Sequence, residues 1–477
     1  MLLGQLLVAN GLVSQEDVAA GLRYQRQNGG RIGEILVAMG RLSREDLVAV
    51  LASVPPAPQS VADTGIALSE LIDLLTKTML AGGVDTVARV AEEMHLPPRV
   101  AHQLVDEAKE RQLLEALGST TGGLVLTPRY GLSARGRDWA YQAQEKNGYV
   151  GPTPVPLGDY VSRIRLQAIG GERVTPEQVA AAMAGIIVPE ALTGQVGPAI
   201  NSGRAMLLYG PPGNGKTSVA QRIGGIFAAT VYVPFAFEVG GQVIKVFDPD
   251  IHREVPPPEG SGPVPGNTIR ARGLDPRWVP CSRPFVVTGG ELTLEMLDLS
   301  YNAQARFYEA PLHVKALNGA FLIDDFGRQL ARPETLLNRW IVPMESRVDY
   351  LKLHTGKSFT LPFDCLVMFS TNMPPSQLMD AAFLRRIPYK VEVPAPDRDT
   401  FRRIFHEAAA VHGLEAPEEA IGFVMAEIAD RRGQPLAAFQ PNFLLEQVVA
   451  RARYLGIPAR VEEAMLRPAI ENLHTRD

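Results

Sequence analysis

Residues 205–227 constrain the fold of this chain more than any other stretch. They read, in order, as a short apolar run, a glycine-rich loop and an apolar helix: Ala205 to Tyr209, then Gly210-Pro211-Pro212-Gly213-Asn214-Gly215-Lys216-Thr217, then Ser218 to Phe227. The loop fits the pattern G-x-x-x-x-G-K-[ST], with the strand before it and the helix after it that the pattern requires. Because a buried strand that leads into a helix is the unit of a parallel sheet, the sequence predicts an α/β domain here.

The residues of this loop suit the binding of phosphate. Its glycines let backbone N–H groups turn inward around an anion, and the N-terminus of the following helix adds positive potential. We expect Lys216 to reach the β- and γ-phosphates of a nucleoside triphosphate, most directly ATP, and the Thr217 hydroxyl to ligate Mg²⁺. The residues predicted to contact the nucleotide are Gly210, Pro211, Pro212, Gly213, Asn214, Gly215, Lys216, Thr217 and Ser218. The alternative is a chance glycine loop, which is disfavoured because the expected strand precedes the loop and the expected helix follows it.

Two further apolar runs end in polar side chains that suit the same chemistry. Gly319 to Ile323 runs into Asp324 and Asp325, and Cys365 to Thr371 runs into Asn372. We expect Asp324 to hold the Mg²⁺ shell, Asp325 to activate the attacking water, and Asn372 to lie between that water and the γ-phosphate. The alternatives are an acidic turn after an ordinary strand and a turn-forming asparagine.

A pair of arginines, Arg385 and Arg386, follows a short apolar segment that begins at Asp380. An arginine that reaches the γ-phosphate of a neighbouring subunit is a known catalytic device. The alternative is a solvated basic pair on the surface.

These four elements, in this order, resemble the AAA+ ATPase superfamily over about residues 175–460. The resemblance makes them Walker A, Walker B, sensor 1 and the arginine finger, and it implies ATP hydrolysis coupled to conformational change in a ring oligomer, a hexamer. It also implies a helical lid, matched by residues 401–477. A predicted hairpin over residues 347–361 resembles that of the branch holding MoxR-like proteins, enhancer-binding proteins and Clp-type unfoldases.

Two positions depart from the family pattern. Asp325 stands where the family usually has Glu, and its side chain is one methylene shorter. Asn442 stands nearest to the place of the sensor 2 arginine, so we assign no sensor 2 residue. These departures keep a second interpretation open, a nucleotide-gated binding module with little turnover.

Residues 1–55 contain an internal repeat in which Gly4 and Gly33 correspond, an offset of 29 residues, since 33 − 4 = 29. Each copy predicts a short helix, a turn and a second helix capped by Ser14 or Ser43. The segment resembles the N-terminal domain of type II secretion and type IV pilus ATPases, some of which bind cyclic di-GMP. The motif of those domains is half present here: Arg31 and Gln25 match it, but Leu2 and Val54 do not. The alternative is a helical docking domain without that ligand.

Residues 62–150 predict a winged-helix-like domain. The pattern indicates helices at about 65–80, 84–94, 99–117 and 133–146, with short strands near 123–126 and 130–132. Such domains often bind DNA, but residues 57–150 carry nine Lys and Arg against twelve Asp and Glu, so 9 − 12 = −3. A surface that follows phosphates should be basic, so a protein partner is favoured over DNA, and a DNA-binding regulator stays an alternative.

The remaining features complete a multidomain α/β interpretation. Prolines at 55–58 and 152–156 predict linkers, and residues 158–400 form the predicted nucleotide-binding domain. The formal net charge is −5, and the only two cysteines, Cys281 and Cys365, have no metal-ligand spacing, which favours a cytoplasmic protein without a disulfide framework. We expect no membrane span, since no run of about 18 uninterrupted apolar residues occurs.

Overall fold

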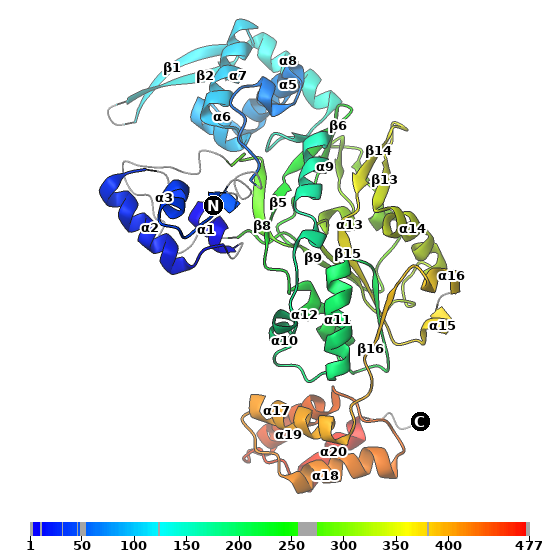
Figure 1. The fold of residues 1–477 in the computed structure, drawn as a ribbon. Coiled ribbons are helices and arrows are strands. Elements are labelled where there is room, and N and C mark those ends of the chain that lie inside the picture. Colours follow the sequence, from blue (N-terminus) through cyan, green and yellow to red (C-terminus); the bar gives the residue numbers. More distant parts are fainter. Residues whose placement is uncertain are drawn as a thin grey trace.

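A computed structural model describes residues 3–9, 12–30, 32–44, 46–47, 54–122, 125–255, 274–378 and 381–473. Four parts follow one another along the chain: small helices at the N-terminus, a helical module with a long hairpin, a central α/β part, and a helical bundle at the C-terminus (Figure 1). The predicted multidomain α/β architecture with a parallel sheet is therefore confirmed.

The central sheet has the strand order β16-β4-β15-β12-β9, and all of its neighbouring strands are parallel. Its strands are β4 (Met206–Tyr209), β9 (Phe285–Thr288), β12 (Gly319–Ile323), β15 (Cys365–Thr371) and β16 (Tyr389–Glu392). Three of them match the predicted apolar runs closely, because each run is buried on both faces and ends at a polar residue or a glycine.

Helices cover both faces of this sheet. Met206 and Leu208 face one cluster with α10 (Pro176–Ala182), α11 (Glu190–Ser202) and α12 (Lys216–Gly224). Leu207 faces another with α13 (Leu312–Lys315) and α14 (Pro333–Ser346). Because successive side chains of a strand point to opposite faces, the chain buries both sides of β4 in a three-layer arrangement.

A second sheet was not predicted from the sequence. It has the order β10-β11-β7-β6-β3, and a separate antiparallel pair, β5-β8, accompanies it. The strands are β3 (Val155–Pro156), β5 (Thr230–Pro234), β6 (Ala236–Val239), β7 (Gln242–Lys245), β8 (Trp278–Ser282), β10 (Ser300–Asn302) and β11 (Phe307–Glu309). We call these seven strands the inserted sheets, because most of them lie between α12 and β12 in the sequence. In the segment 152–156, predicted to be a linker, the last two residues form β3 and pair with β6.

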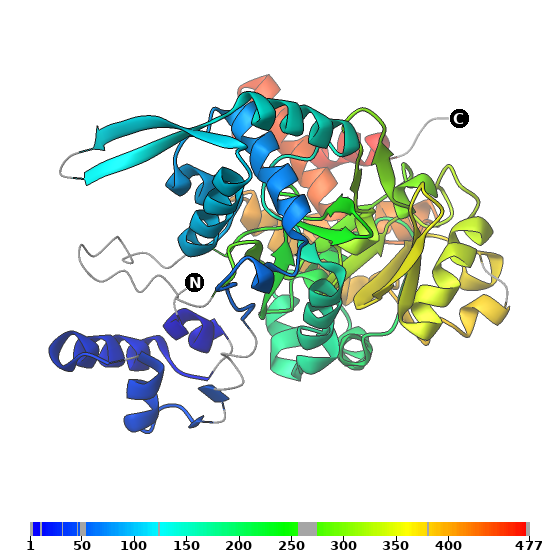
Figure 2. The same cartoon turned by 90° about the horizontal axis from the view of Figure 1, so that it is seen from above.

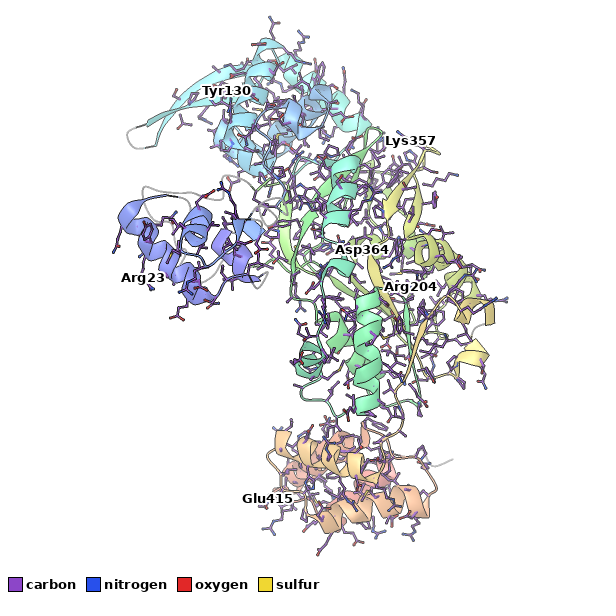
Figure 3. All side chains as sticks on the ribbon, in the orientation of Figure 1. Arg23, Tyr130, Arg204, Lys357, Asp364 and Glu415 are labelled. Atoms are coloured by element: carbon purple, nitrogen blue, oxygen red, sulfur yellow. The ribbon has the colours of Figure 1, made fainter. Side chains whose placement is uncertain are left out.

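A hairpin of β13 (Val348–Lys352) and β14 (Ser358–Pro362) lies before β15, as the sequence predicts. Its tip bears Lys357, which Figure 3 labels. The tip packs on the β6–β7 turn, where a Cβ added to Gly240 would lie 2.7 Å from the Lys357 ammonium. Gly240 and Gly241 both have positive φ, at 61° and 77°, which fits the predicted Gly-Gly turn.

The N-terminal repeat forms α1 (Leu3–Ala9), α2 (Gln15–Asn28) and α3 (Ile32–Ala38). A Cβ added to Gly4 would lie 2.6 Å from Val18, and one added to Gly33 would lie 2.7 Å from Leu47, which is the same contact 29 residues on, since 47 − 18 = 29. Both predicted caps are present, with the Ser14 hydroxyl accepting from Asp17 N–H and that of Ser43 from Asp46 N–H. Leu2 and Arg31 lie outside the described residues.

The next module contains η1 (Ala62–Thr64), α5 (Leu68–Gly82), α6 (Val87–Glu93), α7 (Pro98–Glu110), β1 (Leu114–Gly122), β2 (Val125–Leu132) and α8 (Ala134–Lys146). The third predicted helix is too long, because Gln112 has φ 60° and the Leu113 N–H closes the helix on the Ala108 carbonyl. Residues up to Gly122 are therefore strand instead. Figure 2 shows the resulting β1–β2 hairpin projecting away from the rest of the chain.

The turn between α6 and α7 packs on the inserted sheets. His95 Nδ1 lies 3.1 Å from the Pro276 carbonyl oxygen, and the His95 ring lies 4.4 Å from that of Phe235. The buried guanidinium of Arg277 donates to the Thr64 carbonyl at 2.8 Å. The α6–α7 turn and η1 are therefore held against the central part of the chain.

The C-terminal bundle comprises α17 (Arg398–Val411), α18 (Glu418–Met425), the π-helix η4 (Ala426–Arg431), α19 (Gln440–Leu455) and α20 (Glu463–Asn472). It has a hydrophobic core of its own and lies beneath α11 and α12 (Figure 1). We call it the lid bundle after the helical lid that the sequence predicts, a role that stays a prediction.

Two further observations concern the cysteines and the possibility of a membrane-spanning helix in the described part of the chain. Cys281 and Cys365 are both buried and free. No helix in these ranges is long and apolar enough to cross a membrane.

Candidate nucleotide site

The strand order brings the predicted site residues to one edge of the central sheet. β15 lies between β4 and β12, although β12 precedes β15 in the sequence. The three strands are parallel, so residues that follow Tyr209, Ile323 and Thr371 gather at the same edge. Asn372 thus lies between the loop after β4 and the acidic pair after β12.

The loop of residues 210–217, which we call the P-loop, depends on its glycines. Gly210, Gly213 and Gly215 have φ values of 145°, 77° and 82°, which side chains rarely adopt. A Cβ at Gly210 would also lie 2.2 Å from the Val393 carbonyl oxygen. Gly215 precedes the first residue of α12, so the P-loop leads directly into a helix N-terminus.

Lys216 is buried, with 6% of its surface exposed, and its ammonium group spans the P-loop. The Nζ atom donates to the Gly210 carbonyl at 3.0 Å and to the Pro211 carbonyl at 2.8 Å. Burial lowers the pKa of Lys216, while the carboxylates of Asp325 and Asp324 act in the opposite direction. The cation is therefore held over the P-loop by contacts that a phosphate oxygen can replace.

Thr217 and Asp324 meet directly. The Thr217 hydroxyl donates to Asp324 Oδ2 at 2.8 Å. A hydroxyl and a carboxylate at this separation are hard oxygen donors of the kind that Mg²⁺ takes in proteins. The pair therefore fits the magnesium site that the sequence predicts.

Asp325 has a left-handed backbone with φ 47°, and its carboxylate faces the end of β15. The Asn372 side-chain amide donates to Asp325 Oδ1 at 2.9 Å. Gln329 supports this turn, because its amide donates to the Asp324 carbonyl at 2.9 Å and accepts from Gly327 N–H at 2.8 Å. Sequence reasoning missed Gln329, for which no known motif gives a signal.

The lid bundle contacts the P-loop through the residues just before α19. The Phe439 N–H donates to the Gly213 carbonyl at 2.9 Å, and the Ala438 N–H donates to Asn214 Oδ1 at 3.1 Å. Asn442, the nearest residue to the sensor 2 position, instead bonds within the bundle, with Oδ1 2.9 Å from His412 Nε2. Sequence reasoning missed Ala438 and Phe439.

The two arginines lie elsewhere. They follow α16 (Ala381–Leu384), which stands well apart from α12 in Figure 1. Arg385 is exposed, and Arg386 Nε donates to Glu345 Oε1 of α14 at 2.6 Å. A catalytic role for either arginine stays a prediction about a second copy of the chain. Asp380 lies outside the described residues.

Comparison with known proteins gives remote similarities. Residues 397–472 match a family described as "Domain of unknown function (DUF8689)". No curated protein matches the chain. Similar solved structures include NtrX from Brucella abortus, at 15% identity and TM-score 0.38 over 63% of this chain and 59% of that one. The Thermotoga maritima RuvB Holliday junction branch migration motor is 16% identical, with TM-score 0.33, over 60% of this chain and 70% of that one.

NtrX in complex with ATP gives the same TM-score of 0.38 at 14% identity, over 63% of this chain and 58% of that one. The chain thus spans about three fifths of the length of NtrX. At this level of similarity, function is inferred from the chain's own residues.

Proposed function

We propose that this protein is an AAA+ ATPase, which binds ATP in the P-loop and hydrolyses it to change the conformation of a protein partner. The observation that carries the proposal is the 2.8 Å contact between Thr217 and Asp324, which lie 107 residues apart in sequence. Thr217 lies in the first turn of α12 and Asp324 directly follows β12, so a chance glycine loop would have no reason to have this carboxylate beside it.

Each group has a distinct role in this proposal. Lys216 neutralises the β- and γ-phosphates, and Thr217 with Asp324 would hold Mg²⁺, which supplies charge neutralisation at the phosphates when bound. Asp325 orients and deprotonates the attacking water, and Asn372 positions that water.

The assembly and partner are also part of the proposal. The exposed Arg385 supports a ring of several copies, a hexamer in the related superfamily, in which it or Arg386 acts at a neighbour's nucleotide. The partner is a protein rather than DNA, since residues 57–150 carry more acidic than basic side chains, whereas a surface that follows phosphates should be basic. Further proposals from the N-terminal resemblance are a partner in secretion or pilus assembly and cyclic di-GMP binding by residues 1–55. The use of only two cysteines supports a cytoplasmic location.

Steady-state phosphate release tests this function in the full chain. Lys216→Ala should abolish ATP binding, and Asp325→Asn should retain binding while reducing release by at least about 100-fold. Lys352→Ala, which removes an exposed ammonium from β13, serves as the matched control and should behave as wild type. Unchanged release in both site variants would refute the proposal. Specific activity that rises with protein concentration would support the ring.

A second candidate is a nucleotide-gated module with little turnover. It is favoured by the Asn372 amide, which holds Asp325 at 2.9 Å, and by the short side chain of that aspartate. Asp325→Glu restores the missing methylene and separates the two candidates. If the wild type binds ATP without measurable release at every protein concentration, and Asp325→Glu gains release, then the binding module is correct.

A further inference from the structure

A cavity of about 300 Å³ opens on the lid bundle between the π-helix η4 and α20, and none of its residues belongs to the nucleotide site. α18, which runs directly into η4, lies at the end of the bundle away from α11 and α12 (Figure 1). The residues that line the cavity are Glu427, Arg431, Arg432, Arg467, Ile470 and Glu471. All of them except the buried Ile470 carry a formal charge, so the lining favours a charged ligand over an apolar one.

The π-helix places two arginines beside one glutamate. Its i→i+5 hydrogen bonds make each turn wider than a turn of α-helix, so residues five apart lie nearly above one another. Glu427 and Arg432, the residue that caps η4, have this spacing, and Arg431 precedes Arg432 directly. In a regular α-helix only residues three or four apart are neighbours on the surface, and Arg432 would lie away from Glu427. Single π-turns within helices are frequent at functional sites.

The ion pairs within the cavity leave one guanidinium uncompensated. Glu427 Oε1 accepts from Arg431 Nη1 at 2.7 Å, and Arg467 Nη1 lies 3.7 Å from the same oxygen. Among the described residues, no carboxylate forms an ion pair with the exposed Arg432. The lining carries three arginines against two glutamates, so 3 − 2 = +1. An anion is therefore the ligand that this lining can balance.

The wall of the cavity opposite η4 is fixed before any ligand arrives. The Arg467 guanidinium lies 5.1 Å from the centroid of the Phe423 ring and also bonds to Glu463. Ile470, one turn further along α20, is 1% exposed and joins the core of the bundle. Side chains that are already held in place lose little conformational entropy when a ligand binds.

We propose that the cavity receives the carboxylate of an acidic segment of the protein partner, with the Arg432 guanidinium as its principal contact. The inference rests on the proposed function, because a protein partner is part of that function. One carboxylate balances the charge of the lining, and a guanidinium can donate two parallel hydrogen bonds to it. Arg431 and Arg467 are 68% and 47% exposed, whereas small-molecule sites enclose most of their ligand. This openness favours a side chain carried by a larger partner.

The test measures fluorescence anisotropy of the full chain, without nucleotide, with a labelled peptide of alternating glutamate and serine. The same peptide with glutamine in place of glutamate is the reference. The wild type should bind the glutamate peptide at least about 10-fold more tightly, and Arg432→Gln should weaken that binding by roughly 10-fold while leaving the glutamine peptide unchanged. Arg453→Gln is the matched control, because it removes the same charge from an exposed position of α19 that does not line the cavity. It should bind both peptides as the wild type does.

Three results would overturn the inference. Equal losses in Arg432→Gln and Arg453→Gln would mean that the peptide senses only the net charge of the bundle. Displacement of the peptide by acetate at concentrations comparable to those of unlabelled peptide would mean that the cavity holds small carboxylates. Displacement by inorganic phosphate at lower concentration than by acetate, at equal ionic strength, would mean that it is a phosphate site. Failure of the proposed function is distinct, because it is observed as unchanged phosphate release in Lys216→Ala and Asp325→Asn.

Discussion

Gly213→Ala and Gly215→Ala form a matched pair that tests how the lid bundle is attached. Both glycines have similar positive φ values, 77° and 82°, so alanine costs about 1 kcal/mol of backbone strain at either position. The surroundings differ. A Cβ at Gly213 would lie 2.3 Å from the Phe439 ring, whereas one at Gly215 has its nearest neighbour, Ser218, at 4.0 Å.

The difference between the two variants can be estimated from the contact that is lost. Gly213→Ala must displace Phe439, and with it the 2.9 Å bond from the Phe439 N–H to the Gly213 carbonyl. A hydrogen bond of this kind contributes about 0.5–1.5 kcal/mol. Local opening of the turn should therefore be roughly 2- to 13-fold more frequent in Gly213→Ala than in Gly215→Ala.

Hydrogen exchange measured without nucleotide reports this opening directly. The amides of Ala438 and Phe439 should exchange faster in Gly213→Ala, and the amides in the core of α19 should exchange equally in both variants. If the two variants exchange these amides at the same rate, then the lid bundle is not attached to the P-loop through this contact.

Two further predictions concern stability. Asp349→Asn should lower the free energy of unfolding by about 3–5 kcal/mol in urea titrations, because Asp349 is buried between His313 and Arg339, at 2.6 and 2.7 Å, and its loss leaves Arg339 without its buried carboxylate partner. Asp298→Asn removes an exposed carboxylate 3.6 Å from the same arginine and should change the free energy of unfolding by less than about 1 kcal/mol. Burial lowers the pKa of Lys77 to about 8 from 10.5, so between these pH values the unfolded chain keeps a proton that the folded chain has lost. The contribution of Lys77 to stability should therefore rise with pH in this window, and it is measured as the difference in pH dependence between the wild type and Lys77→Met.

The P-loop and its flanks were predictable because the signal is local. β12 was located over its full length, since five apolar or small residues end abruptly at Asp324. The strand order was not predicted, because no local pattern tells which parallel strand lies beside which. Asn372 lies beside Asp325 only because β15 inserts between β4 and β12.

The predictions from the sequence were wrong or incomplete where contacts between residues far apart in the chain decide the local structure. Residues 113–117 continue the apolar pattern of α7, but the backbone reverses at Gln112 and the chain pairs with β2 instead. The contact between Asn214 and Ala438 joins residues 224 apart in sequence, so no spacing could reveal it. Tertiary packing overrides local propensity in both places.

A continuous set of contacts connects the P-loop edge with the N-terminal modules. Asn372 directly follows β15, and the β13–β14 hairpin precedes β15 directly in the chain. The hairpin tip touches Gly240 through Lys357, and the next residue, Gly241, lies beside Glu70 of α5. Coupling between the nucleotide site and the N-terminal modules requires an element that can adopt two arrangements, in addition to a path of contacts. Under the proposed function the bond between Asn372 and Asp325 would be such an element, because the Asn372 amide would turn from the carboxylate to the attacking water. Nucleotide binding is therefore expected to reach Glu70, whose pKa is already raised by burial and by the charge of Glu238.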